Sequence, residues 1–176
     1  GLGDVYKRQY YTLLFDDKYR VKIATRNINI PGVQNFRDLG GYPSYSTKKQ
    51  MRWGMIYRSA EIDSLECSSR RELKNLGIKT LIDLRASSEI GRQSPLQKGF
   101  NVVHIPLATG DMEGILKGIR EEKIKSDTVY RMVERMNRIL IDQYTKEYRQ
   151  IFDILLDKNS YPVVIHCSSG KGRTGI

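Results

Sequence analysis

The chain has 176 residues, enough for one globular domain with a substantial core. Its 30 lysines and arginines against 20 aspartates and glutamates give a net charge of +10, which favours anionic partners. No nucleic-acid-binding module or long basic tract is visible, so nucleic acid is set aside as a partner. No apolar run reaches the ~20 residues of a membrane span, and two cysteines, Cys67 and Cys167, do not make a disulfide framework.

The first 27 residues predict a leader followed by a β-hairpin. Residues 1–9 contain Asp4–Gln9, which resembles translated adapter sequence, so we expect 1–9 to be a non-native leader. Two β-rich runs, Tyr10–Phe15 and Tyr19–Ala24, are separated by three polar residues and predict a hairpin within residues 10–27. We interpret its tyrosines as sheet-packing residues.

The next segment is rich in turns and ends in a strand. Pro31–Tyr45 contains the run N-F-R-D-L-G-G-Y, in which the glycines predict a turn and Arg37 with Asp38 is interpreted as an ordinary surface ion pair. Trp53–Tyr57 predicts a strand, and the residues around its end read Y-R-S-A-E.

A helix and a buried strand follow. Cys67–Leu76 predicts a helix, because a serine can cap its start and a glycine follows its last residue. Ile78–Leu84 is apolar and β-branched and predicts a buried parallel strand. Ligands of open parallel sheets bind beyond the carboxyl ends of the strands, so Asp83 and Arg85 are expected in the same crevice as the C-terminal loop. Ser87–Glu89 predicts a short helix.

One more strand precedes a long helical region. Phe100–Ile105 predicts the strand, and Asp111 is the first carboxylate after it, in a loop that contains a glycine. Met112–Lys158 predicts two or three helices, with breaks near Gly118 and at Ser126-Asp127. This alternation predicts an α/β fold: a central, mostly parallel sheet flanked by helices on both sides, with a small N-terminal hairpin.

The most informative sequence motif lies at the end of the chain. Tyr161–Ile165 predicts a buried strand, and it runs into a glycine-rich loop in which Cys167 and Arg173 are five residues apart. A loop curled at a helix start points its N–H groups at an oxyanion such as phosphate, and an arginine fork can hold two phosphate oxygens. A cysteine in that field has its pKa lowered to roughly 3.5–7.5, so Cys167 would be a thiolate facing the bound phosphoryl group.

The other residues of the loop have supporting roles. The amides of Ser168, Ser169, Gly170, Lys171 and Gly172 are expected to bind substrate oxygens, and the Lys171 side chain adds positive charge.

Two residues that flank this run each have a competing interpretation. His166 would fix the loop and tune the thiol, or serve as a core histidine at a strand end. Thr174 would donate a hydrogen bond to the thiolate, or be an ordinary first-turn helix residue.

The loop resembles the signature loop of the cysteine-dependent protein tyrosine phosphatases. It matches H-C-x-x-G-K-x-R-[ST]-G, the pattern of the dual-specificity and phosphoinositide phosphatases. The N-F-R-D-L-G-G-Y and Y-R-S-A-E segments are similar to those of the bacterial and fungal tyrosine and lipid phosphatases. The resemblance covers residues 28–176 and implies a phosphatase domain with the phosphotyrosine phosphatase-like fold. It also implies that this domain is incomplete at its C-terminus.

The resemblance implies hydrolysis through a phosphocysteine, without metal or cofactor, on phosphorylated proteins or phosphoinositides. Lys171 resembles the loop lysines of the phosphatase-and-tensin-type lipid phosphatases, but Ser168 stands where those enzymes have another lysine. The general acid has two candidates. Flap-type relatives carry it where Asp111 lies, whereas the bacterial subgroup uses the aspartate of its D-L-R motif, here Asp83. We slightly favour Asp83 and expect the other to be a structural carboxylate.

Two other functions stay open. A catalytically silent phosphate-binding pseudophosphatase would keep the loop without turnover, and a sulfur transferase or arsenate reductase would use a cysteine loop for other chemistry. A nucleophilic thiol must stay reduced, which favours the cytoplasm, with secretion and a missing true N-terminus as the alternative. The oligomeric state is not readable from the sequence.

Overall fold

The computed structural model describes residues 8–63, 66–90, 98–108, 117–121 and 123–175. An antiparallel hairpin precedes a sheet of five strands. The hairpin consists of β1 (Tyr11–Phe15) and β2 (Tyr19–Ile23), and the sheet of β3 (Arg37–Asp38), β4 (Ile56–Ser59), β5 (Thr80–Asp83), β6 (Asn101–His104) and β7 (Val163–His166). The helices are α1 (Cys67–Asn75), α3 (Ser126–Gln143), α4 (Thr145–Leu156) and α5 (Gly172–Gly175), with 3₁₀ turns η1 (Ser87–Glu89) and η3 (Lys158–Ser160).

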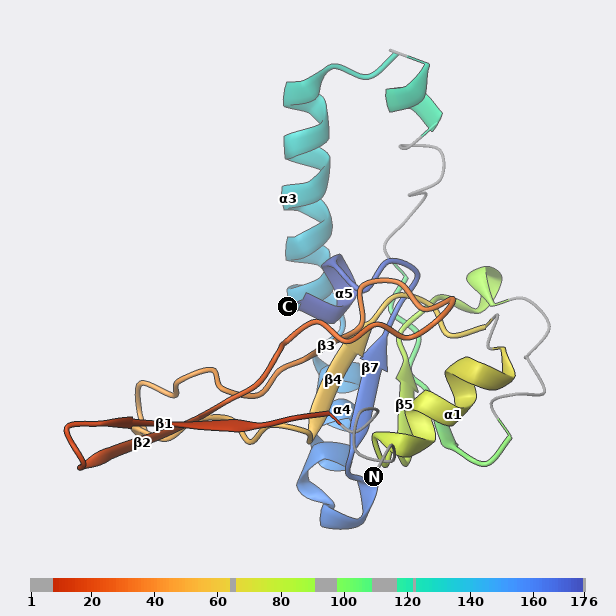
Figure 1. Ribbon diagram of the computed structural model, residues 1–176. Helices are drawn as coiled ribbons and strands as arrows, with labels where there is room; N and C mark the ends of the chain where they lie inside the picture. The colour runs from red at the N-terminus through yellow and green to blue at the C-terminus, as the bar shows by residue number, and fades with distance from the viewer. Residues whose placement is uncertain (1–7, 64–65, 91–97, 109–116, 122, 176) are drawn as a thin grey trace.

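The sheet brings the end of β7 to the middle of one edge. Its strand order is β3-β4-β7-β5-β6, in which β4, β7, β5 and β6 are parallel and β3 is antiparallel to β4 (Figure 1). His166, the last residue of β7, lies opposite Ser59 of β4 and Asp83 of β5. The mostly parallel sheet predicted from the sequence is therefore confirmed, and the segment after β7 emerges between two neighbouring strand ends.

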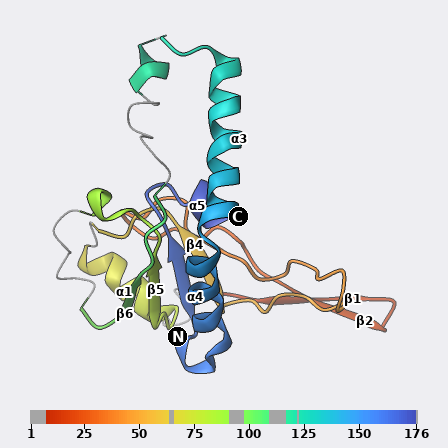
Figure 2. The same ribbon diagram turned by 180° about the vertical axis from the view of Figure 1, so that it is seen from behind.

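Helices cover both faces of the sheet. α1 lies in front of the sheet in Figure 1, and α4 lies in front of it in the reverse view of Figure 2. On the α1 side, Leu73 packs with Leu81 of β5 and Val164 of β7. On the α4 side, Ile151 packs with Ile82 and Val163. Side chains of one strand thus alternate between two apolar clusters, as a sheet buried on both faces requires.

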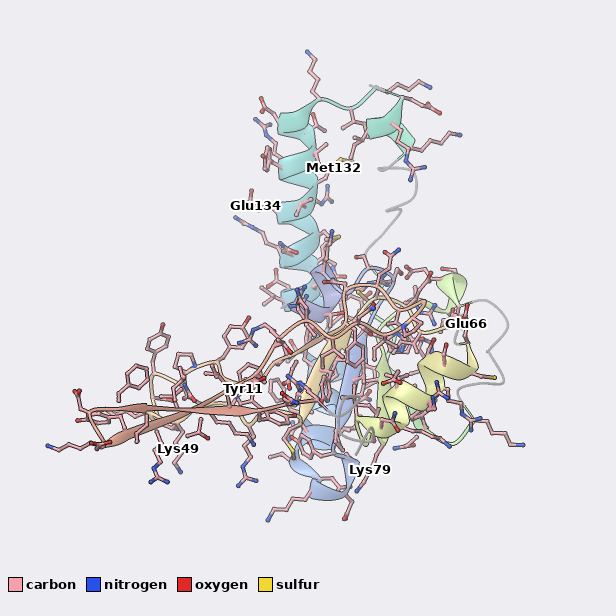
Figure 3. All side chains as sticks on the ribbon, in the orientation of Figure 1. Tyr11, Lys49, Glu66, Lys79, Met132 and Glu134 are labelled. Atoms are coloured by element: carbon pink, nitrogen blue, oxygen red, sulfur yellow. The ribbon has the colours of Figure 1, made fainter. Side chains whose placement is uncertain are left out.

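The hairpin and α3 extend from this body. Figure 3 shows Tyr11 on the hairpin and Met132 and Glu134 on α3, both elements standing away from the central sheet. Tyr11 and Tyr19 are 57% and 67% exposed, so the interpretation of the hairpin tyrosines as sheet-packing residues is wrong. A two-stranded ribbon has no covering layer, and β-rich residues on both of its faces remain in solvent.

Two local predictions need correction. The strand expected at Trp53–Tyr57 begins later, at Ile56, because Gly54 forms a turn with a positive φ of 78°. Asp38 is not half of a surface pair: it is fully buried, pairs with Arg8 and accepts N–H bonds from Gly40 and Gly54.

The long helical region also differs from the sequence prediction. α3 begins at the predicted break, Ser126, but a second break at Tyr144 separates it from α4.

We found no helix in the described ranges that combines the length and apolarity needed to cross a bilayer.

Candidate active site

A loop joins β7 to α5 at the carboxyl edge of the sheet. Gly170 has a φ of +66°, and a Cβ added there would lie 2.3 Å from the carbonyl oxygen of Ser59. Only glycine fits this position, because the loop is pressed against the end of β4. The pattern of glycines in the sequence therefore corresponds to a close approach between two backbone segments.

Side chains from distant segments hold the loop carbonyls from outside. Asn35 donates through Nδ2 to the carbonyls of Ser169 (2.9 Å) and Gly170 (3.2 Å). Arg58 donates to the carbonyls of Gly170 (2.7 Å) and Lys171 (2.8 Å). In Figure 1 the orange segment between β2 and β4 passes next to the blue loop after β7, as these bonds require. Carbonyls that are bonded outward leave the loop N–H groups free to face the thiol.

The thiol of Cys167 lies inside this curl. It is 2% exposed, packs with the α4-side cluster, and accepts a hydrogen bond from the Gly170 N–H at 3.2 Å. Burial opposes a thiolate, but the Thr174 hydroxyl, the N–H groups of Ser169 and Gly170 and the Arg173 charge together lower the pKa of Cys167. The Thr174 hydroxyl is buried and has no hydrogen-bond partner among the described residues, which leaves it available to the thiolate. A lowered pKa increases the fraction of thiolate, which is the nucleophilic form of cysteine.

We expect Thr174→Val to move the acid limb of kcat/KM, measured against pH on an aryl phosphate, upward by about one pH unit. The substitution removes a hydrogen bond to the charged thiolate, a contact worth about one pKa unit. With a higher thiol pKa, a higher pH is needed for the same fraction of thiolate. Thr12→Val, at an exposed hairpin position, is the control and should leave the limb unchanged. An unshifted limb in the Thr174 variant would show that this hydroxyl does not tune the thiol.

Arg173 is held in place by Glu89 of η1. Its Nη1 and Nη2 donate to the two carboxylate oxygens of Glu89 at 2.5 and 2.8 Å, and Nη2 also donates to Ser168 Oγ at 2.9 Å. The Ser168 hydroxyl donates to Glu89 in turn, at 2.6 Å. The bonds from Arg173 lower the pKa of Glu89 to about 2, so this carboxylate is ionised at all physiological pH values. The guanidinium thus has one fixed orientation beside the thiol.

Asp83 belongs to a buried network on the other side of the sheet. It is 3% exposed and accepts bonds from Arg85 Nε at 3.0 Å and Nη2 at 2.6 Å, and Arg85 also binds Asp63. Burial disfavours its charge, but the bonds from Arg85 and the nearby His166 leave its pKa lowered. Burial lowers the pKa of His166 to about 4, so that ring is neutral. The carboxyl group of Asp83 is therefore an ion locked to an arginine in this structure.

Asp83 and the Cys167 thiol lie on opposite faces of the sheet. Leu81 and Val164 pack on the α1 side, and alternation along β5 and β7 places Asp83 and His166 on that same side. Cys167 packs with the cluster on the α4 side. Asp111 lies outside the described residues.

The segment leading to Asp111 is anchored beside the loop. The carbonyl of Leu107 accepts a bond from Arg173 Nη1 at 3.2 Å. The backbone N–H and carbonyl of Ala108 both bond to the hydroxyl of Tyr144, at 3.1 and 2.9 Å. Ala108 is thus fixed next to the arginine, three residues before Asp111.

The structure brings most of the predicted loop residues together but gives Arg85 different surroundings. The loop groups gather around Cys167, and the Lys171 side chain points away into solvent as an exposed residue. Arg85 is 1% exposed and its guanidinium is taken up by Asp83 and Asp63.

Sequence reasoning assigned no role to Asn35, Arg58 or Glu89. Asn35 and Arg58 lie in the N-F-R-D-L-G-G-Y and Y-R-S-A-E motifs that carried the family resemblance. Those motifs were the sequence signal that could have identified them. Within the described part of the chain, no cluster of His, Cys, Asp and Glu side chains is arranged to hold a metal ion.

Comparisons with known proteins agree with this geometry. The family described as "Tyrosine phosphatase family" matches residues 28–176. The chain is 29% identical to the "Triple specificity protein phosphatase PtpB" of Mycobacterium tuberculosis, over 83% of this chain and 59% of that protein. It is 25% identical to a putative tyrosine-protein phosphatase of Cupriavidus necator, over 81% of this chain and 52% of that protein. The chain thus spans between about half and three fifths of the curated relatives it matches.

Among solved structures, the crystal structure of P. aeruginosa TpbA in complex with pTyr is similar over 78% of this chain and 63% of that one, at 17% identity and a TM-score of 0.35. That score is too low to support any argument about the site. The family match alone covers most of the sequence, including the entire cysteine loop. The chain belongs to the tyrosine phosphatase family.

Proposed function

We propose that the protein hydrolyses phosphate monoesters through a phosphocysteine intermediate, with phosphotyrosine in proteins as its main substrate. Phosphoserine, phosphothreonine and phosphoinositides fit the same chemistry. The observation that carries this proposal is the placement of the Cys167 thiol, with its lowered pKa, inside a curl of N–H groups beside a fixed arginine. This combination suits a dianionic group and a nucleophile that attacks it.

In the first step, the Cys167 thiolate attacks phosphorus in line with the leaving oxygen. A sulfur–phosphorus bond forms while the bond from phosphorus to the leaving oxygen breaks. The loop N–H groups and Arg173 bind the three equatorial oxygens, over which charge is spread in a loose transition state. A carboxylic acid gives its proton to the leaving oxygen, so the alcohol departs neutral.

In the second step, the same residue, now a carboxylate, takes a proton from water. The water oxygen attacks phosphorus, the sulfur–phosphorus bond breaks, and inorganic phosphate and the Cys167 thiolate are released. No net redox change occurs, and the carboxylic acid is regenerated for the next turnover.

We assign the acid to Asp111 and a positioning role to Asp83. A general acid must carry a proton, whereas Asp83 is an ion bonded to Arg85, on the α1 side of the sheet. Asp111 comes three positions after Ala108 in the sequence. Ala108 follows Leu107, whose carbonyl accepts a bond from Arg173. This short sequence distance from a residue anchored beside Arg173 supports Asp111 as the acid.

Asp111→Asn is expected to lower kcat/KM on phenyl phosphate by about 10²-fold or more, which is the usual contribution of a general acid. The loss of kcat/KM on p-nitrophenyl phosphate should be much smaller, because that leaving group departs without protonation. Asp83→Asn is the matched comparison. It should lower the melting temperature by several degrees, since it removes one of the two carboxylates that pair with buried Arg85, and affect both substrates equally. A loss that depends on the leaving group in the Asp83 variant alone would assign the acid to Asp83.

The proposed function is tested by rapid-quench kinetics on p-nitrophenyl phosphate with chelator present, using the full natural protein. A burst of nitrophenol equal to the enzyme concentration is expected, with covalent phosphate on a peptide containing Cys167. Phosphate bound without turnover would indicate a phosphate-binding pseudophosphatase. Turnover of thiosulfate or arsenate, without a phosphoenzyme, would indicate the other cysteine-loop chemistries.

A further inference from the structure

One face of the β1–β2 hairpin consists only of aliphatic and aromatic side chains. Successive residues of a strand point to opposite faces, so each cross-strand pair shares one face. The apolar face joins three such pairs: Tyr11 with Ile23, Leu13 with Val21, and Phe15 with Tyr19. The reverse face carries Thr12 opposite Lys22 and Leu14 opposite Arg20. The hairpin is therefore an amphipathic ribbon.

Most of this apolar face is exposed, and other exposed hydrophobic side chains lie nearby in the sequence. Nine of the fifteen exposed large hydrophobic side chains among the described residues fall between positions 10 and 51: Tyr10, Tyr11, Leu13, Leu14, Phe15, Tyr19, Tyr42, Tyr45 and Met51. An exposed apolar patch of this kind marks a surface that another molecule covers.

The loop between β3 and β4 extends from the body together with the hairpin. Trp53 donates through Nε1 to the carbonyl of Lys22 at 2.8 Å, and the Arg26 guanidinium lies 4.0 Å from the centroid of the Tyr42 ring. Figures 1 and 2 show the loop and the hairpin projecting in the same direction, and Figure 3 labels Tyr11 and Lys49 on this projection. Residues 10–26 and 42–53 are called the arm below.

The arm is also strongly basic. It has two acidic residues, Asp16 and Asp17, against seven basic ones: Lys18, Arg20, Lys22, Arg26, Lys48, Lys49 and Arg52. The resulting +5 is half of the net charge of +10 of the whole chain. All of these cations except Arg26 are exposed, and none of the seven pairs with a carboxylate of the described residues.

We propose that the arm docks the protein on the surface of an anionic lipid bilayer. The aromatic side chains of the apolar face suit the boundary between headgroups and acyl chains. Lysine and arginine have long stems that let their charges reach lipid phosphates from the reverse face and from the loop. A second copy of the chain would bring the same +5 against the arm, so charge favours the bilayer. This inference is independent of the proposed phosphatase activity.

The electrostatic part is tested by co-sedimentation of the full-length protein with vesicles. We compare phosphatidylcholine alone with phosphatidylcholine containing about a quarter phosphatidylserine, and expect at least roughly tenfold tighter binding to the anionic vesicles. Lys48→Gln with Lys49→Gln should weaken that binding by about tenfold or more, since each cation near the surface contributes roughly fivefold. Arg71→Gln with Lys74→Gln, at exposed positions of α1, removes the same charge and should keep binding within about twofold.

The apolar part is tested by Leu13→Ser with Phe15→Ser. This pair should weaken binding to the anionic vesicles by at least about tenfold, because it removes two side chains that enter the interface. Phe152→Ser with Leu156→Ser, exposed on α4, is the matched control and should leave binding unchanged. The melting temperature of the Leu13 and Phe15 variant should stay within a few degrees of the parent, since both sites are exposed.

Three results would overturn the inference. The first is equal binding to neutral and anionic vesicles, and the second is an equal loss in the arm variants and their controls. The third is a dimer, seen by sedimentation equilibrium, that Leu13→Ser with Phe15→Ser dissociates, because it would assign the apolar face to a second copy. Failure to hydrolyse p-nitrophenyl phosphate would contradict the proposed function alone, since vesicle binding needs no turnover.

Discussion

Cys167→Ser is expected to lower kcat for aryl phosphate hydrolysis by on the order of 10⁴-fold or more, the scale seen when a nucleophile is removed. The groups that lower the pKa of Cys167 stabilise a thiolate: the Thr174 hydroxyl, two loop N–H groups and the Arg173 charge. A serine hydroxyl in the same curl stays protonated at neutral pH, so no charged nucleophile faces the phosphorus. The measurement is steady-state kcat with chelator present.

Binding should survive this substitution, because the loop N–H groups and Arg173 are unchanged. The dissociation constant of the serine variant for a phosphotyrosine peptide, measured by calorimetry, is expected to stay within a few-fold of the substrate Kd that single-turnover kinetics give for the parent. Cys67→Ser is the matched control: Cys67 is the other free thiol, exposed at the start of α1, and its loss should change neither rate nor affinity. Residual turnover above about 1% in the Cys167 variant would be incompatible with a phosphocysteine route.

The cysteine loop was predictable because its determinants are contiguous. The apolar strand, the cysteine, the glycines and the arginine all fall within residues 161–175, and the geometry of the loop depends largely on that run. The close packing at Gly170 shows why the pattern is informative: a side chain there would collide with the backbone of Ser59. The parallel sheet followed in the same way from short apolar runs that alternate with helical periodicity.

The supporting residues were not predictable, because their contacts join distant parts of the chain. Glu89 is 84 residues from Arg173, and Asn35 is 134 residues from Ser169. Nothing in a short stretch of sequence shows that a glutamate in a 3₁₀ turn will bond to Arg173 of the cysteine loop. Only the fold, which places η1 directly after the carboxyl end of β5, brings them together.

Asp83 shows a related limit of prediction from the sequence. The rule that ligands bind beyond the carboxyl ends of parallel strands placed this residue correctly at the edge of the sheet. The rule does not say which face the side chain takes, nor that Arg85, two residues later, folds back on it. The hairpin tyrosines fail for a similar reason, since β propensity reports a preference for a strand and not the presence of a layer that covers it.

Arg173→Lys is expected to lower kcat by on the order of 10³-fold, the lower range for an arginine that stabilises a phosphoryl transition state. Lysine keeps the charge but presents a point and not a planar fork, so it cannot match two phosphate oxygens at once. Arg138→Lys, in an exposed pair with Glu134 on α3, is the control and should leave kcat unchanged. A fall of less than about tenfold would mean that charge alone suffices at this position.

A double-mutant cycle with Glu89→Gln then shows how the arginine is held. Both Nη atoms of Arg173 bond to Glu89, so this carboxylate fixes the orientation of the fork. Glu89→Gln alone should lower kcat by about tenfold with little change in KM, because the Arg173 guanidinium would then adopt several orientations and not one. In the Arg173→Lys background the same change should have almost no effect, since no fork is left to orient. Additive losses would instead assign Glu89 an effect independent of Arg173, through its bond to Ser168.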